Sequence, residues 1–169
     1  QGNQEVSTVL KKALRDPNPE VVWHAMSALE RLGETSYKED MDLVDSLCLH
    51  LDNPGHPWRE HAAKALGIVG NPRACEPLVN ALASETHGSI VFAIKEALLK
   101  IWSHDAVPLL LAILQDSTLD RRVYPNAADV LRKLGDPSIN DSLLPLTYSS
   151  DKTLRFASVN ALGFSKNIQ

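Results

Sequence analysis

The chain has 169 residues, with 17 Lys and Arg against 21 Asp and Glu, a formal net charge of −4, and 44% apolar but only 5% aromatic residues. This composition is typical of a soluble globular protein, and the negative balance argues against a dedicated binder of nucleic acid or of anionic membranes. No run of about 18 uncharged apolar residues occurs, so no membrane span is predicted and a cytoplasmic location is expected.

The predicted elements are all helices. Apolar residues recur at helical spacing in residues 6–14, and the segment stops at the polar turn 16–19, which contains two prolines. A second helix is expected from residue 19 to residue 32, and Gly33 follows where a left-handed C-terminal cap would fall. The same order of helix, polar turn, helix and cap returns in residues 43–70. Because no segment alternates as a strand would, the predicted fold is all-α.

The sequence repeats itself. Five segments share an ending of the form Ala/Val-Leu followed by a short apolar and polar run, beginning at residues 28, 65, 97, 130 and 161. A near-constant period in the thirties is typical of stacked two-helix units. We therefore predict a single repeat domain over residues 1–169, with repeats at about 4–33, 36–70, 72–102, 104–135 and 137–166.

Two of these repeats carry a family resemblance. Residues 20–33 and 58–74 contain spaced alanines, and the second stretch continues with Ala65-Leu66-Gly67 and Gly70-Asn71-Pro72. They resemble HEAT repeats of the phycobilin-lyase type. The resemblance is weaker in the third repeat, where Trp102 replaces the terminal glycine, and in the fourth, where Pro125 enters the second helix. It implies a right-handed α-solenoid of about five two-helix HEAT-like repeats, which occurs in bilin lyases, phycobilisome-degradation factors, deoxyhypusine hydroxylase and many scaffolds.

The second helices are expected to line the concave surface, which is the usual binding face of a solenoid. Their core stripe consists of residues such as Ala62, Ala65 and Leu66. The side chains opposite this stripe form the predicted partner-binding surface: Trp23, Ser27, Glu30, Glu60, Lys64, Phe92, Glu96, Asp129, Arg132, Phe156 and Asn160. Three aromatic rings in one row suit the anchors of an interface. The alternative is that each ring lies against its neighbouring repeat.

No site for catalysis or metal binding is predicted. His24 and His61 occupy equivalent positions and Glu60 precedes the second, which invites comparison with the His-Glu pairs that hold iron in deoxyhypusine hydroxylase. The later equivalents are Ala93, Asn126 and Ala157, too few ligands for a catalytic iron. Cys48 and Cys75 have no CxxC partner and are interpreted as buried small residues. No cofactor is expected.

The predicted function is that of a non-catalytic scaffold that binds another protein on the concave face. The alternative is a subunit resembling a bilin lyase, or a phycobilisome-associated factor, because the aromatic row could also hold a flat pigment. The sequence begins without Met and ends shortly after a second helix with no evident polar cap. Since solenoids need capping ends, we expect a longer array and possible end-to-end self-association.

Overall fold

The structure is a computed structural model that describes residues 2–54 and 58–163. Helices make up most of this part of the chain, which contains no strand, and the all-α solenoid prediction is confirmed. The first helices of successive repeats are α1 (Gly2–Ala13), α3 (Met41–Asp52), α5 (Cys75–Ser84), α7 (Ala106–Gln115) and α9 (Asn140–Leu143). The second helices are α2 (Pro19–Arg31), α4 (Arg59–Val69), α6 (Gly88–Ile101), α8 (Tyr124–Leu134) and α10 (Lys152–Leu162).

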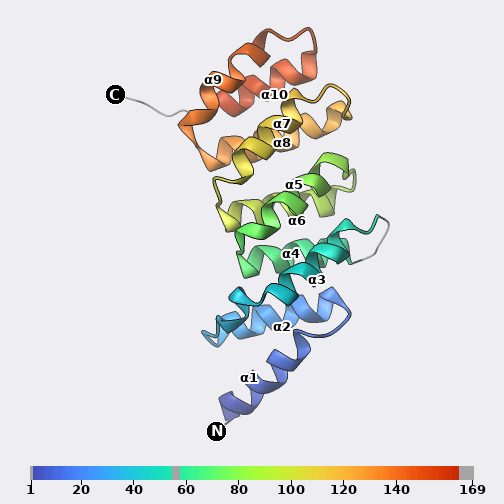
Figure 1. The fold of residues 1–169 in the computed structure, drawn as a ribbon, viewed down its shortest axis with the longest axis vertical. Coiled ribbons are helices and arrows are strands. Elements are labelled where there is room, and N and C mark those ends of the chain that lie inside the picture. The colour runs from blue at the N-terminus through green and yellow to red at the C-terminus, as the bar shows by residue number, and fades with distance from the viewer. Residues whose placement is uncertain (1, 55–57, 164–169) are drawn as a thin grey trace.

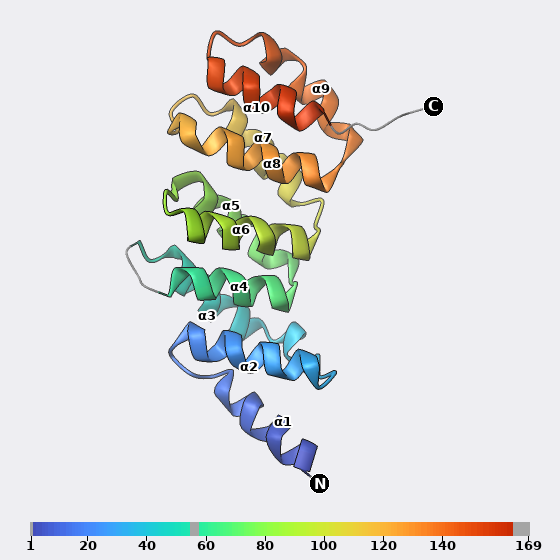
Figure 2. The same ribbon diagram turned by 180° about the vertical axis from the view of Figure 1, so that it is seen from behind.

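The helix pairs are stacked in chain order into an elongated array, with the N-terminus at one end and the last helix at the other (Figure 1). Each second helix packs on the next, from α2 through α4, α6 and α8 to α10, and these five lie side by side on one face (Figure 2). The first helices α3, α5 and α7 pack on one another along the opposite side. Contacts join neighbouring repeats, so each repeat depends on the one before and the one after it.

Asparagine and aspartate side chains start the helices. Asn18 caps α2 by accepting a hydrogen bond from the backbone N–H of Glu20, and Asp40 and Asp151 cap α3 and α10 in the same way. Short 3₁₀ turns precede several helices: η1 (Ser36–Glu39), η2 (Pro72–Ala74), η3 (Arg121–Val123) and η4 (Pro137–Ile139). The predicted helix boundaries therefore follow local chemistry that is visible in the sequence.

The second helices α2, α4, α6 and α8 end in left-handed backbone. Gly33, Gly70 and Gly135 have φ values of 75°, 70° and 65°, as their sequence positions predicted. Trp102 takes the equivalent place in the third repeat and has a φ of 48°. It is the one residue other than glycine with positive φ in the described part of the chain.

The core is a continuous stack of Leu, Ile, Val and Ala side chains between the two helix layers. Ala62, Ala65 and Leu66, predicted for the core stripe of α4, are fully buried. Gly67 is also buried, because α4 lies so close to α6 that a Cβ on Gly67 would stand 2.9 Å from the Cα of Ala97. The position of Gly67 is therefore needed for the packing of α4 against α6.

Arg59 connects two repeats through the core. Its Nε donates to the carbonyl of Leu51 at 2.7 Å, and its guanidinium forms a buried ion pair with Glu85 in the turn of the next repeat. Arg155 of α10, by contrast, donates to the carbonyls of Ser149 and Ser150 in its own turn.

The fifth repeat departs from the others. Its first helix is broken into α9 and the 3₁₀ turn η5 (Pro145–Tyr148), because Pro145 comes five residues after α9 begins, rather than in the first turn where proline is tolerated. In α5 and α7, by contrast, the proline is the third residue. The predicted end of this repeat, residues 164–166, lies outside the described residues, as do residues 55–57 at the start of the second helix expected there.

Candidate partner-binding surfaces

The eleven residues of the predicted surface all lie on the second helices, and none is buried. We call the outer surface formed by α2, α4, α6, α8 and α10 the second-helix face. It divides into a cluster around Trp23, an ionic cluster around Asp129, and exposed apolar side chains. Ser27 and Glu30 lie on α2, and Glu96 lies on α6.

The Trp23 ring is half-buried and enclosed by its neighbours. The ring of His24 lies 4.5 Å from it and that of His61 5.4 Å from it, centroid to centroid. The ammonium of Lys64 sits 4.9 Å from the ring centroid, in a cation–π contact, and also pairs with Glu60 at 2.6 Å. Lys64 and Ser89, which donate hydrogen bonds to Glu60, hold the pKa of that carboxyl below its ordinary value. Trp23 therefore lies against the neighbouring repeat.

An ionic cluster joins α6 to α8. Asp129 pairs with Lys95 of α6 at 2.6 Å, with Arg132 at 2.7 Å and with Lys133 at 3.5 Å. Burial by itself would raise the pKa of Asp129, but the hydrogen bonds from Lys95 and Arg132 outweigh it and lower the pKa to about 2. Asp129 is consequently ionised at neutral pH and ties two repeats together. Lys95 did not figure in the sequence prediction, because it lies one residue from the chosen row.

Two phenylalanines remain exposed on the second-helix face. The side chain of Phe92 on α6 is 64% exposed and that of Phe156 on α10 is 66% exposed. Beside Phe156, Val159 is 56% exposed, and a hollow of about 400 Å³ lies between α8 and α10, lined by Arg132, Phe156, Val159, Asn160 and Gly163. The sequence analysis did not predict Val159. The feature that could have identified it is a large apolar residue at a position outside the core stripe of its helix.

His24 and His61 flank the Trp23 ring from two helices. Within residues 2–54 and 58–163, no three His, Cys, Asp or Glu side chains converge closely enough to hold a metal ion. The packing on Trp23 gives these two histidines a structural position. In the same part of the chain, none of the helices has the length and apolar content that crossing a membrane requires.

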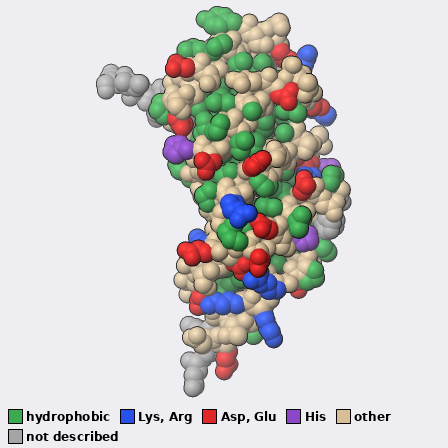
Figure 3. Space-filling view, in the orientation of Figure 1, with side chains coloured by type: hydrophobic (Ala, Val, Ile, Leu, Met, Phe, Trp, Pro, Cys, Tyr) green, Lys and Arg blue, Asp and Glu red, His purple; other side chains and the backbone are tan. Residues whose placement is uncertain are grey.

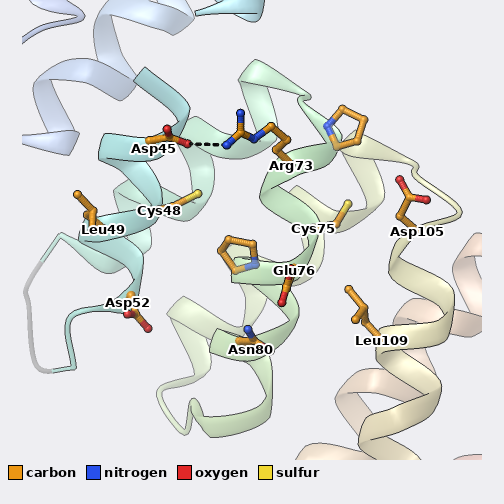
Figure 4. A pocket seen from close by; sticks show the side chains of 12 residues that line it. Asp45, Cys48, Leu49, Asp52, Arg73, Cys75, Glu76, Asn80, Asp105 and Leu109 are labelled. Atoms are coloured by element: carbon orange, nitrogen blue, oxygen red, sulfur yellow. Dashed lines mark ion pairs between the residues drawn. The ribbon is translucent and has the colours of Figure 1, made fainter. Parts of the chain in front are cut away.

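The opposite side of the array carries a groove that the sequence analysis did not predict. It has a volume of about 760 Å³ and runs from α3 across α5 to α7 (Figure 4). We call it the first-helix groove; its lining residues are Asp45, Cys48, Leu49, Asp52, Pro72, Arg73, Cys75, Glu76, Pro77, Asn80, Asp105 and Leu109. Leu49 and Leu109 lie outside the core stripes of their helices. Apolar residues at such positions are the feature of the sequence that could have indicated this groove.

Both cysteines line this groove. Cys75 is buried, in agreement with its interpretation as a small core residue, whereas Cys48 is only half-buried and packs against the core from the groove. Burial, reinforced by the charge of Asp45, raises the pKa of the Cys48 thiol to about 11, and burial also raises the pKa of Cys75. Neither thiol is a ready nucleophile at neutral pH, because the thiolate is the reactive form.

The comparisons with known proteins agree with this architecture. A family model described as HEAT repeats matches residues 44–124. HEAT repeats thus occupy residues 44–124 of the chain. The bilin biosynthesis protein PecE of Mastigocladus laminosus is 32% identical over 108 residues, which cover 64% of this chain and 39% of PecE.

Two solved structures resemble the HEAT array. Human deoxyhypusine hydroxylase in complex with glycerol aligns with a TM-score of 0.60 and 21% identity, over 95% of this chain and 62% of that one. A designed armadillo-repeat protein in complex with a (KR)4 peptide aligns with a TM-score of 0.49 and 16% identity, over 92% of this chain and 80% of that one. The chain thus spans less than two thirds of both PecE and the human enzyme, and the likeness to the human enzyme concerns the fold alone.

Proposed function

We propose that this HEAT array is a non-catalytic scaffold that binds a partner protein on the second-helix face. The observation that supports this most is the contrast between charged and apolar groups there. Lys64, Lys95 and Arg132 each pair with a carboxylate of the same face, whereas Phe92 and Phe156 are about two thirds exposed. These three cations are thus neutralised within the face, whereas the two phenylalanine rings are uncovered, and an apolar partner surface would cover them.

The same contrast bears on the class of partner. A surface built to bind phosphates needs cations that are available to them, but the cations named above are neutralised within the face. Aromatic anchors surrounded by polar groups are the usual composition of a protein interface, and a few of them carry most of the binding free energy. Phe92 and Phe156 are the proposed anchors, and Trp23 contributes a covered ring at the edge.

The experiment is a quantitative pull-down from native lysate with the wild type, the double variant Phe92→Ser/Phe156→Ser, and Tyr148→Ser. Tyr148 is the matched control, an aromatic residue that is 87% exposed but lies on η5. At least one protein should be recovered stoichiometrically by the wild type and by the control, and about tenfold less by the double variant. Equal recovery by all three baits would place the interface elsewhere and overturn the proposal.

The alternative function, a bilin lyase-like subunit or phycobilisome-associated factor, is favoured by the likeness to PecE. It predicts that a linear bilin added to the chain acquires a red-shifted absorption band, which Trp23→Ala and Phe92→Ala remove. The residues to be tested come from α2 and α6 of the same face. An unchanged bilin spectrum contradicts this alternative and leaves the scaffold.

End-to-end self-association is a further part of the proposal. The first repeat exposes Val6 and Val9 on α1, and the last exposes Leu144 and Tyr148. Exposed apolar side chains of this kind favour contact with another repeat surface. Small-angle scattering over a concentration series should therefore show growth of the array, which Val9→Ser should reduce; a monodisperse monomer at high concentration contradicts it.

A further inference from the structure

We propose that the first-helix groove binds an extended basic peptide segment whose lysine or arginine residues alternate with apolar ones. The groove lies on the side of the array away from the second-helix face, so it would serve a second partner. Its volume of about 760 Å³ is within the range of ligand-binding sites. Figure 3 shows this side, where acidic side chains occur among exposed hydrophobic ones over the middle of the array.

The charge of the groove indicates a cationic occupant. Asp45, Asp52, Glu76 and Asp105 line it, and Arg73 is its single cation. Arg73 pairs only with Asp45, at 3.6 Å, whereas the other three carboxylates take part in no ion pair among the described residues. A cleft lined by one sign of charge over apolar walls concentrates the opposite charge.

The spacing of these carboxylates indicates an extended occupant instead of a single ion. Asp52 lies in the last turn of α3, Glu76 in the first turn of α5 and Asp105 just before α7 (Figure 4). They lie in or next to the first helices of three successive repeats, and no three carboxylates of the described chain converge on one point. Since packed helices are about 10 Å apart, the groove spans roughly 20 Å, the length of about six extended residues.

The walls of the groove indicate that the occupant also carries apolar side chains. Leu49 of α3 is 75% exposed beside the groove, and Pro77 and Leu109 lie on α5 and α7. Carboxylates and apolar side chains thus occur together along all three helices. Successive residues of an extended chain point to opposite sides. In a chain that alternates basic and apolar residues, the basic side chains can therefore meet the carboxylates while the apolar ones cover the apolar side chains of the walls.

The test measures the fluorescence anisotropy of three labelled six-residue peptides, with alternating Lys-Leu, Lys-Ser and Glu-Leu sequences. The Lys-Leu peptide should bind the wild type about tenfold more tightly than the Lys-Ser peptide, and its affinity should fall as salt is raised from about 50 to 300 mM. The Glu-Leu peptide should not bind. Leu49→Ser should weaken the Lys-Leu peptide selectively and bring it close to the Lys-Ser peptide.

Matched variants separate the groove from general electrostatics. The triple variant Asp52→Asn/Glu76→Gln/Asp105→Asn removes three charges inside the groove, and Glu39→Gln/Asp42→Asn/Asp141→Asn removes three exposed ones outside it. Only the first should weaken the Lys-Leu peptide, by about tenfold or more. Phe92→Ser/Phe156→Ser should bind it as the wild type does, which keeps this test independent of the proposed function. Thermal unfolding of each variant confirms that it is folded.

Three outcomes would overturn the proposal. Equal weakening by the two triple variants would mean that net charge, and not the groove, attracts the peptide. Equal affinity for the Lys-Ser and Lys-Leu peptides would leave the apolar walls without a role. Displacement of the peptide by spermidine at equal concentration would identify the occupant as a small polyamine.

Discussion

The left-handed backbone that ends α2, α4 and α8 is formed by glycine, and the equivalent position after α6 is occupied by Trp102. A side chain in this conformation costs about 1–2 kcal/mol, because its Cβ crowds the following carbonyl. The Trp102 side chain is 56% exposed, so part of it is free to contact a partner. A strained backbone conformation of this kind persists only where the surrounding structure holds it. Here it is held by the turn that caps α6 and leads into α7.

Replacing Trp102 measures that strain. Trp102→Gly should be more stable than Trp102→Ala by about 1 kcal/mol in urea unfolding, because both remove the ring but only glycine accepts the positive φ. The control is Ala112→Gly on the exposed side of α7, where the order should reverse and glycine should cost about 0.5–1 kcal/mol. If Trp102→Ala is as stable as Trp102→Gly, the backbone at this position is not strained.

Asp129 gives the array a pH-dependent contribution to stability. Its folded-state pKa of about 2 lies below the ordinary value of 3.8, so its contribution is complete above pH 4 and is lost as the pH falls towards 2. Asp129→Asn should lower the free energy of unfolding by about 1–2 kcal/mol at pH 7, and by progressively less between pH 4 and pH 2. Asp141→Asn, an exposed aspartate on α9, should match the wild type throughout. A constant deficit at every pH would show that Asp129 acts through packing.

Single residues also show where reasoning from the sequence stops. Helical spacing correctly predicted which side of α4 is buried and which glycines end the second helices, because both follow from local geometry. It could not distinguish the covered ring of Trp23 from the exposed rings of Phe92 and Phe156. That difference depends on which side chain of the next repeat faces each ring, and Lys64 happens to face Trp23.

At the scale of the elements, the close contact between α4 and α6 leaves no room for a larger side chain at position 67. Because a Cβ on Gly67 would stand 2.9 Å from the Cα of Ala97, the backbone itself would have to move. Gly67→Ala should therefore cost about 1–3 kcal/mol, although alanine is the better helix former. Gly88→Ala at the start of α6, where nothing lies within 4 Å, should be neutral or slightly stabilising.

Urea unfolding of the two variants checks this comparison. A Gly67→Ala variant as stable as Gly88→Ala would mean that α4 and α6 can separate without loss, and that the close approach does not hold the repeats in position. This contact could not be predicted from the sequence, in which Gly67 stands out only as part of the family-like Ala65-Leu66-Gly67 segment. The distance between two helices of different repeats depends on the side chains that both helices place at their contact. The pattern of one helix gives only one of these two sets of side chains.

The first-helix groove was missed for a related reason. Helical periodicity assigns the positions outside the core stripe of a first helix to solvent, and Asp45, Leu49 and Asp52 occupy such positions. Only the stacking of α3, α5 and α7 brings their outward side chains into one groove. The fold was thus predictable from repeated local patterns, whereas the surfaces required the spatial order of the repeats.

At the scale of the whole molecule, the array has no central core to which every element contributes. The helix α6 packs against α4, α5 and α8, and α9 packs against α10 and the turns beside it. In such a chain of nearest-neighbour contacts, stability is close to a sum of repeat and interface contributions. A defect in the middle weakens two interfaces, and a defect at the end weakens one.

Two buried leucines test this directly. Leu98 of α6 and Leu143 of α9 are both fully buried, and replacing either with alanine should cost about 2–5 kcal/mol locally. In hydrogen exchange read by mass spectrometry, Leu143→Ala should lose protection only in α9 and α10. Leu98→Ala should lose it in α5 and α6 and, through both interfaces, in α4 and α8. A uniform loss along the chain in both variants would contradict the nearest-neighbour picture, because it would mean that the repeats unfold as one cooperative unit.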